Sequence, residues 1–321
     1  KWANQSGTWS FCIEPADMLG QIAFSTTDHS ALQSFIEHEK SKLIDHLNTT
    51  VAQNMKKRGG GVLRMDATMV SEKLSTVSLY FNPCEAMGAN ALNQTLAELK
   101  KIIEEKTEIQ GLSAILSNRM KPNARAELTI KNVEEDLGTA ISLLSDWAQN
   151  DPNRATTHNK GIMNAVDGLL IATGNDWRAV ASSCHAWACQ SGSYRGLSQW
   201  SYQKRTLTGR IELPLQIGVI GGMTAIHPTA KTCMNVMKIN TREHLSTCIL
   251  SAGLLQNLSA LRALASEGIV PGHMQLHIEN ILQQSVIEPE KKNRVRSALK
   301  EHLQKNGHIS ASIAQQLMEQ L

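Results

Sequence analysis

The feature that most constrains the fold of this chain is an alternation of strand-like and helix-like patterns between residues 18 and 130. Short runs of apolar and β-branched residues predict strands, and apolar residues that recur every three or four positions predict helices. In chain order the predicted elements are a strand at Gly20–Phe24, a helix from Leu32 to Met55, strands at Val62–Met65 and Ser75–Phe81, a helix at Met87–Glu105 and a strand at Leu112–Leu116. This order predicts the ferredoxin-like arrangement, an antiparallel sheet covered on one face by two helices.

The rest of the chain favours helices. Apolar periodicity predicts helices at Val133–Gln149, over residues 160–171 and 176–190, and from Arg242 to Glu267. The first of these should stop before Pro152, because proline does not continue a helix. Leu207–Ile220 is a segment that favours a strand.

These patterns predict an α+β fold with an inserted domain. A small ferredoxin-like domain, residues 18–121, is inserted into a helix-rich large domain made of residues 1–17 and 122–270. The Pro271-Gly272 pair then breaks the chain before residues 271–321, which are helical in pattern and rich in Lys, Glu and Gln. We expect this C-terminal segment to be either a helical flap or a solvated helical tail.

Composition and charge exclude several classes of protein. With 321 residues, of which 41% are hydrophobic and 19% charged, the chain can build a core and is not intrinsically disordered. Its net charge of +3 is too small to indicate nucleic acid or membrane lipid as a partner. The longest weakly polar run, Ile211–Ile226, is shorter than the ~20 residues of a membrane-spanning helix.

Cysteine usage favours a cytoplasmic protein. The 6 cysteines have no framework spacing, which is typical of reduced thiols. Cys184, His185 and Cys189 lack the spacing of a zinc site, so we expect them to be packing residues and expect no metal. Because the chain begins with Lys1 and not Met, we expect an upstream segment or a tag to be missing.

Three clusters of residues could carry chemistry. The glycines of Gly218–Gly222 do not have the G-x-G-x-x-G spacing of a Rossmann domain, and they favour tight packing over a phosphate site. Lys160 lies in a segment dense in polar donors, and Asp176 stands at a predicted helix start. The two could form a proton-transfer or oxyanion-stabilising pair, or Asp176 could simply cap its helix while Lys160 is exposed. At Cys84–Asn90, small residues at a helix start leave backbone N–H groups open to a pyrophosphate.

Several runs of residues together resemble one enzyme family. They are Glu85–Asn90 with Asn93, His158–Asn164, Ala172–Val180, His227–Ala230, Gln256–Leu258 with Leu261–Ala265, and Glu267–Ile269 with Gly272–Met274. In order and spacing, over essentially the whole chain, they resemble the 3-hydroxy-3-methylglutaryl-coenzyme A (HMG-CoA) reductases, and the bacterial class II enzymes most closely.

The resemblance implies a four-electron reduction. Members of the family reduce HMG-CoA with two hydrides from a nicotinamide cofactor, through a bound hemithioacetal and aldehyde, to mevalonate and free CoA. By the same resemblance, Lys160 stabilises the developing oxyanion, Asp176 holds and tunes Lys160, and His273 protonates the departing CoA thiolate. Closure of the C-terminal flap would bring His273 onto the thioester. A fourth catalytic group, a glutamate, is expected upstream of Lys1.

The resemblance also implies binding residues. Arg154 and Asn164 match positions that contact the hydroxymethylglutaryl group, and Asn257 lies in another active-site motif. The small domain of the family binds the dinucleotide without a Rossmann fold. The implied cofactor contacts are Glu85, Met87, Gly88, Ala89 and Asn90, together with Asn118. Glu85 stands where the family usually has Asp.

The choice of cofactor is predicted from four positions. Ala52 stands where NAD-preferring relatives place an aspartate that takes the ribose hydroxyls, and Lys56, Lys57 and Arg58 follow closely. Cations without the anion favour a ribose 2′-phosphate, and therefore NADPH. The alternative is that these basic residues only suit a helix C-terminus and that NADH is used.

The resemblance implies HMG-CoA, mevalonate and CoA as ligands. It also implies a homodimer, or a higher homo-oligomer of dimers, with active sites at the dimer interface. Two alternative functions stay open. One is a catalytically silent homologue that binds a CoA ester or a dinucleotide, and the other is a catabolic enzyme that oxidises mevalonate.

Overall fold

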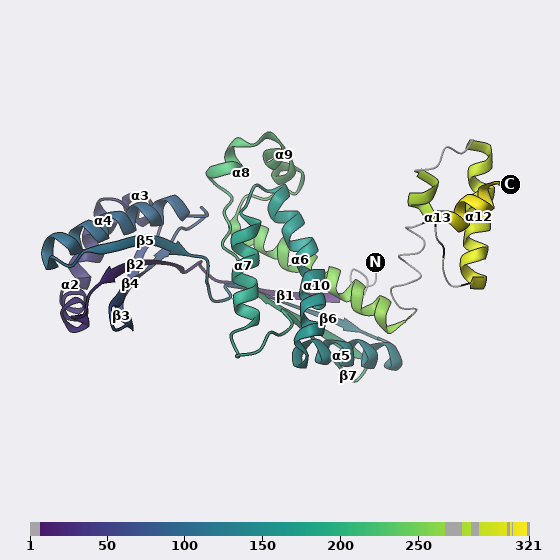
Figure 1. Cartoon of the computed structure of the whole chain (residues 1–321), viewed down its shortest axis with the longest axis horizontal. Coiled ribbons are helices and arrows are strands. Elements are labelled where there is room, and N and C mark those ends of the chain that lie inside the picture. The colour runs from purple at the N-terminus through teal and green to yellow at the C-terminus, as the bar shows by residue number, and fades with distance from the viewer. Residues whose placement is uncertain (1–6, 267–277, 284–288, 307–308, 310, 320–321) are drawn as a thin grey trace. The chain divides into compact units, whose positions relative to one another are not determined.

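The computed structural model describes residues 7–266, 278–283, 289–306, 309 and 311–319 (Figure 1). The chain divides into two compact units, Lys1–Leu258 and Ser259–Leu321. Helices and strands alternate through the first unit, which confirms the predicted α+β class. The finer domain boundaries at residues 18, 122 and 271 stay a prediction.

The first sheet, called sheet 1, contains β2 (Met18–Ser25), β3 (Gly61–Ser71), β4 (Leu74–Asn82) and β5 (Gly111–Ser117). All neighbouring strands are antiparallel, in the order β3-β4-β2-β5. Helices α2 (His29–Thr49) and α4 (Ala89–Thr107) share one apolar core with it. A Cβ added to Gly20 of β2 would lie 2.5 Å from Leu96 of α4, so this helix packs directly on the strand. The elements follow the predicted order.

The first helix of this layer ends earlier than predicted. Helix α2 stops at Thr49, and a single turn, α3 (Gln53–Lys56), precedes the three glycines. The buried Asn48 side chain accepts the Val62 N–H at 2.8 Å and donates to the Val62 carbonyl at 3.0 Å. A continuous helix to Met55 is therefore wrong, because the chain bends here to bring β3 back beside α2.

The second sheet, called sheet 2, was largely missed by the sequence analysis. It contains β1 (Gly7–Ile13), β6 (Ala124–Lys131), β7 (Ser198–Gln203) and β8 (Thr206–Leu213), antiparallel in the order β1-β6-β8-β7. The strand predicted at Leu207–Ile220 is right only as far as Leu213, because Pro214 follows and ends the ladder. The region expected to be helix-rich is built on a sheet.

The helices that follow β6 in the first part of the chain are α5 (Glu135–Asn150), α6 (Pro152–Ala172) and α7 (Trp177–Ala188), before β7, and α8 (Gly222–Ile226), α9 (Pro228–Val236) and α10 (Arg242–Ala265), after β8. Pro152 ends α5 as predicted, but it also begins α6. Asp151 caps α6 by accepting the Asn153 N–H at 2.8 Å, and proline suits the first helical position. The predicted start of this helix at residue 160 is therefore wrong.

Helix α10 is long and apolar enough to cross a membrane by length and composition alone. In the structure part of it packs into the core: Leu245, Ile249 and Leu254 are buried. A Cβ on Gly253 would lie 3.3 Å from Val166 of α6 and 3.4 Å from Ile211 of β8. Ile211–Ile226, the run weighed from the sequence as a possible span, contains instead the end of β8 and the short helix α8.

The second unit has a core of its own. The helices that form this core are residues 278–283, α12 (Pro289–Asn306) and α13 (Ala311–Glu319). The apolar residues that pack together are Ile278, Ile281, Leu282, Val295, Leu299, Ile309 and Ala314. Arg296 of α12 donates two hydrogen bonds to the Glu279 carboxylate, at 2.7 and 3.1 Å.

Candidate active site

The motif at Glu85–Asn90, called the 85–90 motif, forms the turn into α4. Gly88 caps the helix with a φ of +89°, and a Cβ there would lie 2.3 Å from the Pro83 side chain. Only glycine fits this position. The first N–H groups of α4, beginning at Ala89, have no partner within the helix. Together with the helix dipole they form a place where a phosphate is favoured, as the sequence predicted.

A cavity of about 330 Å³ lies against this motif. Its walls come from segments far apart in sequence: Met55, Ala86–Ala91, Gly174, Asn175, Gly218 and Ile220–Thr224. In the sequence, the 85–90 motif and the segment Thr173–Asp176, called the Asp176 loop, are two separate candidates, and no role is predicted for Asn175. The cavity brings the expected cofactor motif beside the loop that leads into the expected catalytic aspartate.

The basic segment Lys56–Arg58 adjoins the 85–90 motif. The Cys84 thiol lies 3.5 Å from the Arg58 carbonyl oxygen, and all three basic side chains are exposed. Ala52 is the N-cap of α3 and is buried in the core of sheet 1. The side chains of Lys56, Lys57 and Arg58 are thus open to solvent, and their part in the choice of cofactor stays a prediction.

Glu85 joins the motif to a distant helix. Its Oε2 accepts the backbone N–H of Arg242, at the start of α10, at 2.6 Å. Its carbonyl oxygen accepts the Val219 N–H at 2.9 Å. Where the family usually has aspartate, the longer glutamate side chain makes this bond to α10. Its role as a cofactor contact stays a prediction.

Asp176 occupies a helix start, as predicted. Its Oδ1 accepts the N–H groups of Arg178 and Ala179, both at 3.1 Å, and so caps α7. The preceding residue, Asn175, is buried and accepts the Gly218 N–H at 2.8 Å. The capping role expected for Asp176 is therefore present, and it leaves the other carboxylate oxygen, Oδ2, outside the capping bonds.

Helix α6 presents Lys160 and Asn164 on one exposed face. They are four residues apart, which places them one above the other on a helix. Arg154 lies on a different, partly buried side of α6, with its guanidinium 5.8 Å from the Trp147 ring. Partial burial lowers the pKa of Arg154, although a guanidinium stays charged near neutral pH.

Lys160 and Asp176 do not meet within one chain. The Asn175 N–H donates to the Leu170 carbonyl at 2.9 Å, so the Asp176 loop folds against the C-terminal end of α6. Leu170 is ten residues beyond Lys160, which is about 15 Å along a helix axis. Helical side chains also lean toward the N-terminus, away from Asp176. The pairing predicted from the sequence would need a second copy of the chain.

Asn257 lies in a buried hydrogen-bond network that the sequence analysis missed. Its Oδ1 accepts from the Ser198 hydroxyl at 2.9 Å and from the Trp200 indole N–H at 2.8 Å. The ring of His158 lies 2.8 Å from Ser198 Oγ and 3.2 Å from Asn257 Nδ2. Burial lowers the pKa of His158 to about 4, and the charge of Arg154 adds to the shift. The network fixes the inner side of α6 against sheet 2.

The remaining predicted residues fall elsewhere. His273 lies outside the described residues. Asn118 follows β5 and is exposed, and it is not among the residues that line the cavity. Cys184 is buried, and burial raises the pKa of its thiol, in keeping with a packing role. Within the described part of the chain no His, Cys, Asp and Glu side chains are grouped to hold a metal ion.

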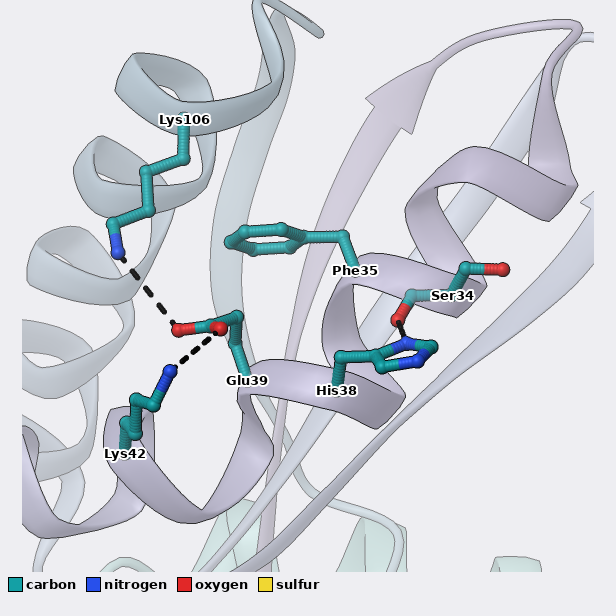
Figure 2. Close-up of a pocket in the computed structure, with 6 residues that line it drawn as sticks. All are labelled: Ser34, Phe35, His38, Glu39, Lys42 and Lys106. Atoms are coloured by element: carbon teal, nitrogen blue, oxygen red, sulfur yellow. Dashed lines mark hydrogen bonds and ion pairs between the residues drawn. The ribbon is translucent and has the colours of Figure 1, made fainter.

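Figure 2 shows a shallow groove between α2 and α4, which is not part of the candidate active site. Glu39 accepts a hydrogen bond from Lys42 at 3.0 Å and forms an ion pair with Lys106 at 3.9 Å, as the dashed lines mark. Lys106 is seventeen residues after Ala89, about 26 Å along α4 from the 85–90 motif. These charges join two helices and lie far from the cavity at the 85–90 motif.

Comparison with curated proteins gives consistent relatives. A 3-hydroxy-3-methylglutaryl-coenzyme A reductase of Archaeoglobus fulgidus is 33% identical over 330 residues, covering 100% of this chain and 74% of that protein. A probable 3-hydroxy-3-methylglutaryl-coenzyme A reductase of Borreliella burgdorferi is 36% identical over 239 residues, covering 71% of this chain and 56% of that protein.

Solved structures agree with these relatives. A 3-hydroxy-3-methylglutaryl-coenzyme A reductase from Streptococcus pneumoniae matches with a TM-score of 0.76 and 31% identity, over 97% of this chain and 76% of that one. A class II enzyme from the same organism, bound to NADPH in open conformations, matches with a TM-score of 0.75 and 34% identity, over 81% and 73% of the two chains. The family model for hydroxymethylglutaryl-coenzyme A reductase matches residues 1–278. With its fold, its motifs and its relatives in agreement, this chain belongs to the hydroxymethylglutaryl-coenzyme A reductase family.

Proposed function

We propose that this protein reduces HMG-CoA to mevalonate and CoA with NADPH. The observation that carries the proposal is that one cavity is lined both by the 85–90 motif and by the loop that leads into Asp176. Membership of the family supports the reaction, and a relative that binds NADPH supports the cofactor.

The residues around the cavity fit a nicotinamide dinucleotide. The N-terminus of α4 offers free N–H groups to the pyrophosphate, and Gly88 allows the chain to turn closely against Pro83 into that helix. The exposed cations of Lys56–Arg58 lie beside the motif and suit a 2′-phosphate. Asn118 would contact the dinucleotide outside this cavity. When bound, the cofactor supplies the hydride.

The residues of the chain supply binding and electrostatics in this proposal. The Lys160 ammonium stabilises the negative charge that develops on the thioester oxygen, and Asp176 holds that ammonium in place. Arg154 and Asn164 orient the hydroxymethylglutaryl group, and Asn257 supports them from the inner side of α6. His273 protonates the CoA thiolate as it leaves.

A homodimer is part of the proposal, because Lys160 lies far along α6 from the helix end against which the Asp176 loop folds. The surface around the Asp176 loop also exposes large apolar side chains: Ile171 is 61% exposed, Trp177 42%, Met223 55% and Ile226 74%. Grouped exposed apolar residues are typical of protein interfaces. A second copy that covers this surface would bring its Lys160 to Asp176 of the first.

The finer organisation follows the sequence. Sheet 1 and its helices would be the inserted ferredoxin-like domain, residues 18–121, that binds the dinucleotide. Residues 1–17 and 122–270 would bind the substrate, and residues 271–321 would form a flap that closes over it. The enzyme would work in the cytoplasm.

The test is a turnover assay on the full-length protein with HMG-CoA and either NADPH or NADH. We expect two molecules of NADPH to be oxidised for each CoA released, with slower oxidation of NADH. Lys160→Ala should lower kcat about 100- to 1,000-fold, the usual loss for one oxyanion-stabilising donor. Lys101→Ala, at an exposed lysine of α4, is the control and should leave kcat unchanged.

Two results would contradict the proposal. Undiminished turnover in Lys160→Ala would remove that residue from the mechanism. NADPH binding without any turnover by the wild-type protein would support a silent binding homologue instead.

A further inference from the structure

The segment Ile217–Ile220 contacts both halves of the proposed active site. Gly218 donates its N–H to Asn175 Oδ1 at 2.8 Å. The next residue, Val219, donates its N–H to the Glu85 carbonyl at 2.9 Å, and Ile220 forms an isolated parallel bridge with Ala86. Successive residues of one short segment therefore hold the Asp176 loop on one side and the 85–90 motif on the other.

The contact with the motif leaves no free space. A Cβ on Gly218 would lie 2.3 Å from the backbone nitrogen of Met87 and 2.7 Å from the carbonyl carbon of Ala86. Both are backbone atoms, which cannot move aside as a flexible side chain can. Because tightly packed interiors transmit displacement, a shift of Gly218 must displace the motif as well.

Asn175 is held in place by hydrogen bonds of both its side chain and its backbone. It is 8% exposed, and its Nδ2 donates to Thr173 Oγ1 at 3.0 Å. Its backbone N–H donates to the Leu170 carbonyl at 2.9 Å. The Thr173 carbonyl in turn accepts from the Thr224 hydroxyl at 3.0 Å, across the cavity wall. The Asn175 side chain is therefore held rigidly, and this residue stands directly before Asp176 in the chain.

We propose that Asn175 is a positioning residue that fixes the cofactor motif and the catalytic Asp176 relative to each other. It acts through the Gly218 backbone on Glu85–Met87, and through the chain itself on Asp176. The inference rests on the proposed function, since it concerns the alignment of a bound dinucleotide with the catalytic carboxylate. Reaction rates are sensitive to such alignment, because a small misplacement of reacting groups raises the barrier.

A matched control separates this role from simple stabilisation. Asn123 is also buried, at 4% exposed, and its Oδ1 accepts the Leu215 N–H at 2.7 Å. Its Nδ2 donates to the Leu215 carbonyl at 3.2 Å. Asn123 therefore braces the same stretch of chain with the same chemical group, but it lines no part of the cofactor cavity.

The experiment compares Asn175→Ala with Asn123→Ala in the full-length protein. Melting temperature, NADPH affinity, kcat and KM are measured for each. Both variants should melt at lower temperature than the wild type. Only Asn175→Ala should weaken NADPH binding, by about tenfold for one buried hydrogen bond, and lower kcat as well. Asn175→Asp keeps Oδ1 as an acceptor for Gly218 and should recover most of the NADPH affinity.

The outcomes are distinguishable. If Asn175→Ala binds NADPH and turns over as Asn123→Ala does, the coupling role is overturned while the proposed function stands. If the wild type shows no turnover, the proposed function fails, and the NADPH affinities of the two variants still decide the coupling. If Asn175→Ala does not fold, Asn175→Ser, whose side chain is too short to reach Gly218, replaces it with the same expected loss of affinity.

Discussion

The ionisation of His158 links the stability of the fold to pH. Burial among Ser198, Asn257 and the first turns of α6 lowers the pKa of this histidine from 6.5 to about 4. In the unfolded chain the imidazole takes up a proton near pH 6.5, whereas in the folded chain it stays neutral until about pH 4. Below pH 6.5 the unfolded state therefore binds more protons, and stability falls as the pH falls toward 4.

We predict that His158→Asn reduces this pH dependence. Between pH 7 and pH 5 the wild type should lose about 2 kcal/mol of unfolding free energy through His158, and the variant should lack that loss. Urea unfolding at the two pH values measures it. His244→Asn is the control, because His244 is exposed on α10. An unchanged pH dependence in His158→Asn would show that the histidine is not held neutral.

The helices of the second unit form a local core. Leu299 of α12 is fully buried there, together with Val295 and Ile281. We predict that Leu299→Ala costs this unit about 2–5 kcal/mol, the usual range for a leucine removed from a core. Hydrogen exchange should then show lost protection in residues 278–319 and unchanged protection in sheets 1 and 2. The neighbouring exposed Lys300, changed to Ala, serves as control.

A loss of protection that spread equally through both sheets would contradict local folding of this unit. In that case Leu299 would stabilise the whole chain cooperatively. Unchanged protection everywhere would mean that the apolar cluster contributes little to holding α12 and α13 together.

The separation of Lys160 from the Asp176 loop along α6 leads to a prediction about the oligomer. If Lys160 of one subunit acts with Asp176 of another, mixing two inactive variants, Lys160→Ala and Asp176→Ala, should restore activity. Half of the randomly mixed dimers would be hybrids, and each hybrid would hold one intact and one doubly altered site. Turnover should reach about one quarter of the wild-type value for a symmetric dimer.

The variants should be unfolded together, mixed and refolded before the assay, so that subunits exchange fully. Each variant refolded alone is the control and should stay inactive. If both residues of a site came from the same chain, every hybrid site would lack one group. Absence of recovery, with dimer formation confirmed by sedimentation, would therefore place both residues in one subunit.

Much of the fold of this protein can be predicted from local patterns in its sequence. The alternation from Gly20 to Leu116 predicted the order of elements around sheet 1, because one-sided burial imposes a period on strands and helices alike. Short motifs predicted a helix start at Met87, one residue before the observed cap at Gly88, and offered an N-cap at Asp176 as one alternative, since each depends on a few neighbouring residues. The same runs predicted the family.

Other features depend on segments that meet only after folding. Sheet 2 was missed although Ala124, Ala126, Leu128 and Ile130 alternate with polar residues, because β1 and β6 gain their pairing from distant partners. The break after Thr49 depends on Asn48 meeting Val62.

The cavity, the network of Asn257 and the separation of Lys160 from Asp176 all result from contacts between residues far apart in the chain. A local pattern indicates which face of a helix or strand is apolar, but it does not indicate which other helix or strand will cover that face. For that reason the family and the helix ends could be predicted from the sequence, whereas the link from Asn175 through Gly218 to the 85–90 motif required the folded chain.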